Sequence, residues 1–361
     1  MKPVSLIVIL PAYNEEVVIA KTIQSIFDAG IEPHQLYVIN DASKDRTAEI
    51  ALSVGVNVIN NQVNLGKARG VENALNLIFH DYRTATVTHV CFMDADTLVD
   101  ANYFRTITKR LEDDLQACHK NIDKRPISVL CGRVKSIPHN WLTAFRAYEL
   151  WLSQTLHKAA QSRIKTITVA PGCASTYSVD ALQSVTWSND TTVEDMDATF
   201  QIILHGGNIT YEPAAVVYTQ DPNTIRDFIG QIGKRWYPGI WQVVGKHEVL
   251  RRGWFTLFNW ECRLLMVEPI LFVGVILYTL FFNLSSLPAF VGYSYLIVIP
   301  LATVAAFQEK RIDILKSSIF FPIIMISTLF IFVSKVGNIF GRNNKKVKWY
   351  SPERYSMEKT K

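Results

Sequence analysis

Residues 5–15 read SLIVILPAYNE, an apolar run that stops at a proline and continues into polar residues. An unbroken aliphatic run of this length is typical of a strand that is buried on both faces of a sheet. Lys2 before the run suggests a signal peptide, but the run has no small-residue cleavage site and leads straight into Pro11. We therefore expect a central first strand with polar residues just beyond its end.

The residues that follow alternate β-rich apolar runs with helical patterns. The expected elements are a helix near 17–29, a strand at 35–40, a helix near 45–54 and strands at 56–60 and 89–93. Such alternation predicts an α/β fold, in which a parallel sheet is flanked by helices and ligands bind beyond the carboxyl ends of the strands.

Two carboxylates follow the run at 89–93. Asp94 and Asp96 are one residue apart, so in an extended chain their side chains point the same way and repel each other unless a cation lies near them. Hard oxygen ligands at this spacing suit Mg²⁺ or Mn²⁺, which also binds and neutralises a diphosphate. The alternative is that Asp96 or Thr97 caps a helix that runs on through Tyr103.

A second acidic pair, Glu194 and Asp195, opens an amphipathic pattern that ends at Gly206. Acids in a first helical turn are stabilised by the helix dipole, so capping explains the pair without chemistry. The alternative is that one of these carboxylates acts as a base that accepts a proton.

Composition points to a membrane. The chain has 361 residues, is 49% hydrophobic and has a net charge of +5. Between 264 and 307 the only charged residue is Glu268, and a second apolar run covers 317–333. About 20 apolar residues cross a bilayer, so these stretches predict two spans and one span, with a buried helical hairpin as the alternative. Basic residues before the first span predict that the catalytic part lies in the cytosol, attached to the cell membrane by these spans. We expect no nucleic-acid partner.

The cysteines are odd in number and show no paired metal spacing, in agreement with a reducing compartment. They are Cys91, Cys118, Cys131, Cys173 and Cys262.

Together these motifs resemble the family 2 inverting glycosyltransferases, which have a GT-A type nucleotide-diphospho-sugar fold with a mixed, mainly parallel sheet. The chain is similar in particular to membrane-bound synthases of poly-N-acetylglucosamine, chitin and hyaluronan. The resemblance covers about residues 4–240. The blocks that carry it are PAYNE (11–15), NDASKDRT (40–47), NLGKAR (64–69), the Asp94/Asp96 pair, PGCAS (171–175) and Glu194-Asp195.

The resemblance implies roles for single residues. Pro11, Tyr13, Glu15 and Asp41 would hold the uridine of a UDP-sugar. Lys67 and Asp94 would lie near the ribose and diphosphate, and Asp96 would be the main ligand of Mg²⁺ or Mn²⁺, with Asp94 beside it. Asp195 would be the general base, with Glu194 next to it. The chain departs from the family at Asn40, where a second acid is common.

QIGKRW (231–236) resembles the Gln-x-x-Arg-Trp motif of the polymer-forming members, but it has one extra residue between Gln and Arg. In those members Trp236 would stack against the acceptor sugar, and Arg235 would contact the diphosphate. Gln231 and Cys173 would also lie at the acceptor. On a helix Gln231 still shares a face with Arg235. The alternative is a basic and aromatic helix that only anchors the protein at the membrane interface.

We expect four regions: a cytosolic catalytic domain at 1–230, interfacial helices at 231–263, two to three membrane spans at 264–338 and a basic tail at 339–361. An apolar stripe at 141–160 either lies in the membrane plane or packs against the protein. The basic tail favours a cytosolic end, which three crossings do not give, so one apolar segment is expected to be re-entrant or tilted.

The sequence thus predicts a multi-pass, metal-dependent transferase that moves N-acetylglucosamine or another hexose from a UDP-sugar to a growing β-linked polysaccharide. One alternative is a single transfer to polyprenyl phosphate or another lipid. A second is a catalytically silent nucleotide-binding subunit of an export system. Three spans line a pore poorly, so export would need a partner protein or a second copy.

Overall fold

The computed structural model describes residues 3–81, 84–251, 256–340 and 352–355. The chain forms two compact units. The first contains the described parts of Met1–Lys135, Lys158–Gln220 and Arg354–Lys361, and the second contains Ser136–His157 and the described parts of Asp221–Glu353.

The first unit is built on an eight-stranded mixed sheet with the order β3-β2-β1-β4-β7-β6-β8-β5. Its strands are β1 (Leu6–Ala12), β2 (Leu36–Asn40), β3 (Asn57–Asn60), β4 (His89–Phe92), β5 (Thr97–Val99), β6 (Ile127–Ser136), β7 (Ser175–Ser178) and β8 (Asn208–Thr219). The first four strands pair in parallel, whereas β7 pairs antiparallel with both β4 and β6, and β5 pairs antiparallel with β8. The α/β fold class expected from the sequence is confirmed.

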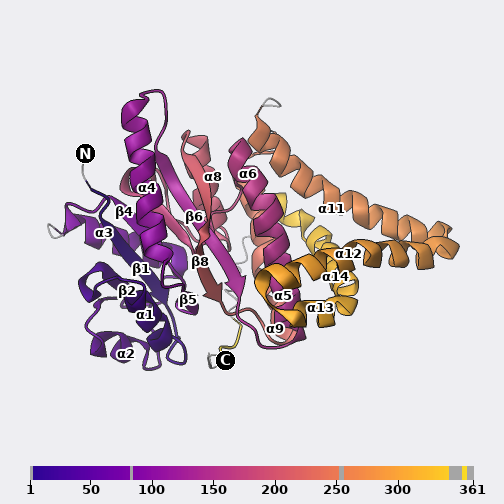
Figure 1. Ribbon diagram of the computed structural model, residues 1–361, viewed down its shortest axis with the longest axis horizontal. Coiled ribbons are helices and arrows are strands. Elements are labelled where there is room, and N and C mark those ends of the chain that lie inside the picture. Colours follow the sequence, from indigo (N-terminus) through magenta and orange to yellow (C-terminus); the bar gives the residue numbers. More distant parts are fainter. Residues whose placement is uncertain (1–2, 82–83, 252–255, 341–351, 356–361) are drawn as a thin grey trace. The chain divides into compact units, whose positions relative to one another are not determined.

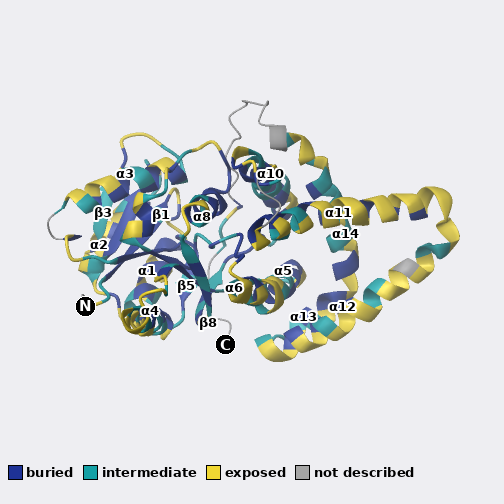
Figure 2. Cartoon of the chain, turned by 90° about the horizontal axis from the view of Figure 1, so that it is seen from above, coloured by how far each residue is buried: buried dark blue, intermediate teal, exposed yellow. Residues whose placement is uncertain are grey.

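Helices cover both faces of this sheet (Figure 1). Those of the first unit are α1 (Ile19–Asp28), α2 (Thr47–Ser53), α3 (Lys67–His80), α4 (Tyr103–Lys120), α6 (Ala159–Ile164), α7 (Val179–Gln183) and α8 (Glu194–Leu204). Seen from above, α3 and α8 lie on one face of the sheet and α1 and α4 on the other (Figure 2). Alternate residues of β1 face the two sides: Ile7 and Ile9 belong to the apolar cluster beneath α3 and α8.

The second unit is helical. Its elements are α5 (Trp141–Leu152), α9 (Ile225–Gln231), the π-helical turn η4 (Ile232–Trp236), α10 (Tyr237–Lys246), α11 (Leu257–Phe282), α12 (Leu287–Glu309), α13 (Ile312–Ser317) and α14 (Phe321–Ser334). A second π-helical stretch, η3 (Ser153–Lys158), connects α5 to α6. Short 3₁₀ turns lie at Leu284–Ser286, Ser318–Phe320 and Val336–Phe340 in this unit and at Pro33–Gln35 in the first unit.

The apolar stripe at 141–160 lies mainly on α5, and most of its large side chains are buried in the second unit. Leu142, Phe145 and Tyr148 are at most 1% exposed, and they cluster with Ala302 of α12 and Phe321 of α14. Of the two alternatives for this stripe, packing against the protein therefore holds for these three side chains.

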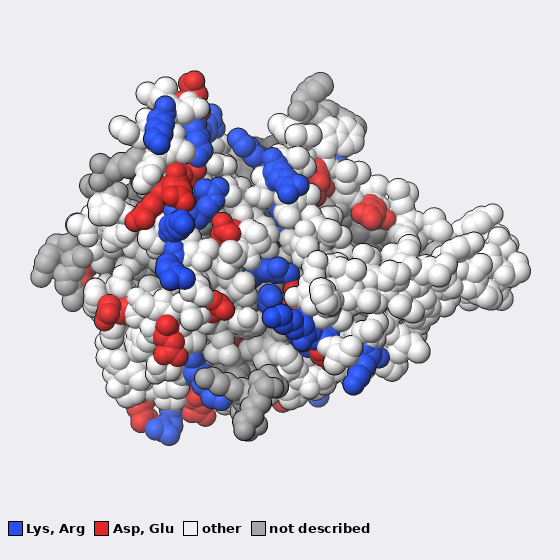
Figure 3. Space-filling model, viewed as in Figure 1, with Lys and Arg blue, Asp and Glu red and all other residues white. Residues whose placement is uncertain are grey.

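Among the residues that the structure describes, three segments are long and apolar enough to cross a membrane: Leu257–Phe282, Leu284–Glu309 and Ile312–Asn338. Their candidate windows are only 22–24% buried within the protein. The part of α11 and α12 between 269 and 308 contains no Lys, Arg, Asp or Glu, and it appears as the uncharged extension in Figure 3. This combination of apolar sequence and exposure is what a lipid-facing surface requires.

Candidate active site of the first unit

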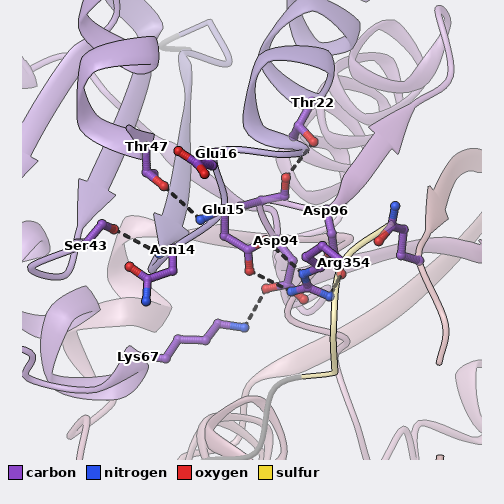
Figure 4. A network of polar contacts seen from close by, with 12 residues as sticks. Asn14, Glu15, Glu16, Thr22, Ser43, Thr47, Lys67, Asp94, Asp96 and Arg354 are labelled. Atoms are coloured by element: carbon purple, nitrogen blue, oxygen red, sulfur yellow. Dashed lines mark hydrogen bonds and ion pairs between the residues drawn. The ribbon is translucent and has the colours of Figure 1, made fainter. Parts of the chain in front are cut away.

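The loops after β1 and β2 are tied to each other by hydrogen bonds. The backbone N–H of Glu15 donates to Thr47 Oγ1 at 2.8 Å, and the N–H of Asn14 donates to Ser43 Oγ at 3.0 Å (Figure 4). In return, Asn14 Oδ1 accepts from the N–H of Lys44 at 2.8 Å, and Asn14 adopts a positive φ of 56°. Because β1, β2 and β4 run in parallel, their carboxyl ends meet at one edge, and these loops form its rim.

Asp41 holds the loop between β3 and α3. Its carboxylate accepts from the side-chain amide of Asn61 at 2.8 Å and from the backbone N–H groups of Leu65 and Gly66, each at 2.9 Å. Gly66 has a φ of 78°, which a residue with a side chain rarely adopts, and it precedes Lys67, the first residue of α3. Both carboxylate oxygens of Asp41 thus accept hydrogen bonds that hold the loop directly before Lys67.

Lys67 connects two of the acidic motifs. Its ammonium lies 2.6 Å from Asp94 Oδ1 and 2.9 Å from Glu194 Oε1, and its side chain is only 16% exposed. Asp94 comes from the end of β4 and Glu194 from the first turn of α8. Two carboxylates that are 100 residues apart in sequence therefore share one largely buried cation.

Asp96 is buried, and only one of its two carboxylate oxygens has a hydrogen-bond partner among the described residues. Its Oδ2 accepts from Arg354, whereas its Oδ1 is buried without a hydrogen-bond partner among the described residues. Burial raises the pKa of Asp96 to about 6; Arg354 opposes this effect, while Asp94 and Glu15 add to it. Asp96 does not cap a helix, because the next element is the strand β5 and α4 begins only at Tyr103.

These carboxylates fit a divalent cation. Among the described residues no three His, Cys, Asp or Glu side chains already form a set of metal ligands. Mg²⁺ and Mn²⁺ sites, however, commonly use one or two carboxylates and complete their shell with phosphate and water oxygens. The unpartnered Oδ1 of Asp96, next to Asp94, offers hard oxygen ligands of this kind.

Asp195 is oriented by backbone groups. Its Oδ2 accepts from the N–H of Gly172 at 3.1 Å, and its Oδ1 accepts from the N–H of Met196 at 2.9 Å. Thr199 fixes the same loop to α8, since it accepts from the N–H of Ala170 and donates to the carbonyl of Asp195. A methyl group on Gly172 would lie 3.1 Å from Lys67 Nζ and 3.7 Å from Asp195 Oδ2, so the absence of a side chain keeps this corner open.

The remaining predicted residues of the first unit differ in exposure. Pro11 is half-buried, Tyr13 is 42% exposed, and Cys173 is 8% exposed. Burial raises the pKa of the Cys173 thiol well above its usual value, and the nearby charges of Asp94 and Asp96 raise it further. Cys173 is therefore a neutral thiol beside the acidic pair.

The other three predicted acceptor residues lie in the second unit, at or beside a π-helical turn. Gln231 ends α9, and Arg235 and Trp236 lie in η4, where hydrogen bonds skip one more residue than in an α-helix. A wider turn absorbs one extra residue, so the interruption coincides with the extra residue between Gln231 and Arg235. The sequence predicted an α-helix here, and the π turn is the difference.

Trp236 is held by a buried arginine. The Arg146 guanidinium lies 4.9 Å from the centroid of the Trp236 ring, close enough for a cation–π contact. Arg146 itself pairs with Asp221 at 3.0 Å and with Glu149 at 2.5 Å.

Comparison with known proteins identifies a family for the N-terminal half of the chain. Residues 7–186 match the profile of the family described as glycosyl transferase family 2. The chain carries a family 2 glycosyltransferase domain. The poly-β-1,6-N-acetyl-D-glucosamine synthase of Staphylococcus aureus (strain COL) is 29% identical over 269 residues, and that of Staphylococcus epidermidis is 28% identical over 268 residues. Each match covers 73% of this chain and 60% of the synthase, so the chain spans about three fifths of the length of these relatives.

The fold also agrees with a solved structure. A mannosyltransferase from Pyrobaculum calidifontis, solved with GDP-mannose and Mn²⁺, superposes with a TM-score of 0.53 at 17% identity and covers 92% of this chain and 86% of its own. The GT-A type fold expected for the family 2 domain is thereby confirmed.

Two residues of the first unit that contact the site were not predicted from the sequence. Arg354 binds Glu15 and Asp96, and Gly172 contacts Asp195. Arg354 ends a segment, 349–354, that resembles the Trp-and-Arg segment after the last span of related synthases, but that resemblance indicates only a cytosolic end and does not point to Glu15 or Asp96. Gly172 lies within a recognised block, but only the structure shows which carboxylate its N–H meets.

Proposed function

We propose that this protein is a membrane-bound inverting glycosyltransferase that moves N-acetylglucosamine or another hexose from a UDP-sugar to a growing β-linked polysaccharide. The observation that carries the proposal is the convergence of Asp94, Asp96, Lys67, Glu194 and Asp195 beyond the carboxyl ends of parallel strands, in a family 2 domain. The name of the staphylococcal relatives supports the sugar and the polymer.

Asp195 is proposed as the general base. Two backbone N–H groups orient its carboxylate, and an oriented carboxylate accepts the proton of the acceptor hydroxyl as that oxygen attacks the anomeric carbon. Attack from the face opposite the nucleotide inverts the configuration at this carbon. Glu194 is not a second base in this scheme, because its carboxylate is paired with Lys67.

The nucleotide would be bound by the loops after β1, β2 and β4. Pro11, Tyr13, Glu15 and Asp41 would surround the nucleoside, and the Lys67 ammonium would meet phosphate oxygens. A divalent cation held by Asp96 and Asp94 would stabilise the charge of the departing diphosphate.

The resemblance supports acceptor roles for Cys173 in the first unit and for Gln231, Arg235 and Trp236 in the second. Trp236 offers an aromatic surface for a sugar ring, and Arg146 against the ring limits its rotation. This motif favours a saccharide acceptor over polyprenyl phosphate or another lipid.

We infer that α11 and α12 cross the bilayer as a hairpin and that the third apolar segment does not cross. At 1.5 Å per residue, α11 and α12 are about 39 and about 35 Å long, enough for a hydrocarbon core of about 30 Å. The third segment, Ile312–Asn338, is also long enough, but it is divided into α13, a 3₁₀ turn and α14, and α14 alone reaches about 21 Å. The chain leaves the first unit at Gln220 and returns to it at Arg354, which binds Glu15 and Asp96. An even number of crossings is required for that return.

The topology is tested with Ser285→Cys, between α11 and α12, against Asp28→Cys on the first unit and a tag after Lys361. A membrane-impermeant maleimide added to intact cells that express the protein should label only Ser285→Cys, and protease should spare the tag. Cleavage of the tag from outside would show that the third segment crosses.

The activity is tested by nucleotide release from the detergent-purified chain over a panel of UDP-sugars and GDP-mannose, each with Mg²⁺ or Mn²⁺. Asp195→Asn should lose release, while the matched control Asp28→Asn, at an exposed carboxylate that accepts a hydrogen bond from Gln24, should keep it. A product ladder supports the polymer, and a single extractable glycolipid would favour the lipid acceptor. Nucleotide binding without release under every condition would favour the silent export subunit.

Export of a polymer is proposed to need a second copy or another membrane protein, because the two or three apolar helices of the described residues line a pore poorly. Polymer that enters vesicles reconstituted with single copies of this chain would contradict this.

A further inference from the structure

We propose that Arg354 is a built-in cation of the donor site, which holds Asp96 until a divalent cation displaces it. The inference rests on the proposed function only in taking Asp96 as a metal ligand. It assigns a role to a residue that lies more than 250 positions after Asp96 in the sequence.

The guanidinium of Arg354 binds two acids with different parts of its fork. Its Nε and Nη2 donate to Glu15 at 2.8 and 2.7 Å, and its Nη1 donates to Asp96 Oδ2 at 2.5 Å (Figure 4). The side chains of Arg354, Glu15 and Asp96 are 19%, 10% and 7% exposed. The neighbouring backbone is anchored as well, since Gln220 donates from its side-chain amide to the carbonyl of Tyr355.

Electrostatics explains why a cation is needed at this place. The carboxylates of Glu15 and Asp96 are both largely buried and contact the same guanidinium, whereas Lys67 is already paired with Asp94 and Glu194. Buried carboxylates without a nearby cation would be strongly destabilising. Arg354 supplies this charge when no metal is bound.

The geometry leaves Asp96 ready for an exchange of cations. Arg354 uses only Oδ2, and Oδ1 is buried with no partner among the residues that the structure describes. A divalent cation binding both Asp96 and Asp94 would bring two positive charges against Nη1. The bidentate contact with Glu15 is separate, so Arg354 can release Asp96 and stay attached to the site.

Competition of this kind predicts that removal of Arg354 strengthens metal binding. The test is a Mn²⁺ titration of the detergent-purified full chain without any sugar nucleotide, in which free Mn²⁺ is followed by electron paramagnetic resonance. Arg354→Met should bind Mn²⁺ about tenfold more tightly than the wild type, since a charge-assisted hydrogen bond of this class corresponds to a factor of ten or more. Adding Asp96→Asn to Arg354→Met should abolish the gain.

Two further variants keep the test decisive. Arg46→Met removes an arginine whose side chain is 69% exposed and pairs with Glu49, so it controls for net charge and should change Mn²⁺ affinity less than about twofold. Arg354→Lys keeps the charge but cannot hold both acids with a fork, and it should give a smaller gain even if Arg354→Met does not fold.

Unchanged or weaker Mn²⁺ binding in the folded Arg354 variants would overturn the proposal, because a merely structural arginine would not oppose the metal. The outcome is separate from that of the proposed function. If the Arg354 variants bind Mn²⁺ more tightly but the wild type transfers no sugar, the proposed function is contradicted and this inference is not. If the wild type transfers sugar but substitutions of Arg354 leave the Mn²⁺ affinity unchanged, this inference is contradicted and the proposed function is not.

Discussion

Replacement of Asp41 by asparagine should loosen the loop that leads into α3. The carboxylate accepts three hydrogen bonds, with Asn61 and Leu65 on Oδ1 and Gly66 on Oδ2. An asparagine amide keeps one acceptor oxygen and turns an NH₂ group toward at least one of these donors. Either the N–H of Gly66, or the two donors of Asn61 and Leu65, then faces the NH₂ group and has no acceptor there.

The magnitude follows from these contacts. A hydrogen bond to a charged group contributes about 1.5 to 3 kcal/mol, and Asp41→Asn loses at least one such bond together with the charge that strengthens the others. We expect local opening of residues 62–68 to become easier by about 2 to 3 kcal/mol, which corresponds to amide exchange about 30 to 150 times faster at Leu65 and Gly66.

The assay is hydrogen–deuterium exchange with mass spectrometry on the detergent-purified chain, with peptides that cover 62–68 and, as an internal reference, 103–120. Asp28→Asn makes the same chemical change at an exposed site that accepts from Gln24. It should leave both peptides unchanged. If peptide 62–68 exchanges at the same rate in Asp41→Asn and in the wild type, the reasoning about this loop is refuted.

Three further outcomes are expected. Gly132→Ala would place a methyl group 2.8 Å from Tyr103 Cε2 and 2.9 Å from the carbonyl of Ala215, so it should destabilise the protein by about 1 to 3 kcal/mol, and an unchanged melting temperature would contradict this. Burial lowers the pKa of His89 to about 4 from 6.5, so the unfolded chain binds a proton that the folded chain refuses. Stability should therefore fall by about 2 kcal/mol between pH 7 and pH 5, and His89→Asn should flatten that slope in urea unfolding at the two pH values. Arg146→Met removes a buried cation that pairs with Asp221 and Glu149 and should cost about 3 to 5 kcal/mol, visible as a lower denaturation midpoint, whereas an unaltered midpoint would mean that these two pairs contribute little.

The parallel half of the sheet could be predicted because its strands are continuous apolar runs. The runs that end at Leu10, Asn40 and Asn60 became β1, β2 and β3, with ends that differ by one or two residues. Buried parallel strands need no alternation, so their signal is local. The antiparallel strands β6, β7 and β8 were not predicted, because their pairing joins segments that are distant in sequence and gives no local period.

The candidate site divides in the same way. Asp94 and Asp96 could be singled out because two like charges at this spacing need a cation, and their place beyond β4 follows from the fold. The contacts of Arg354 and Gly172 depend on how distant segments meet, which no local pattern records. The π turn at Gln231 likewise depends on packing in the second unit, where Ile232 and Phe228 are buried.

The most direct test of the central claim compares binding and chemistry in Asp195→Asn. Donor affinity is measured by calorimetry, and the rate of a single turnover is measured by rapid quench, with the UDP-sugar that the panel identifies. A general base contributes about 10²- to 10⁴-fold to the rate, so we expect Asp195→Asn to lose that much rate while its donor affinity changes less than about threefold. A single-turnover rate equal to that of the wild type would contradict the assignment of Asp195 as the base and, with it, of this site as the place of transfer.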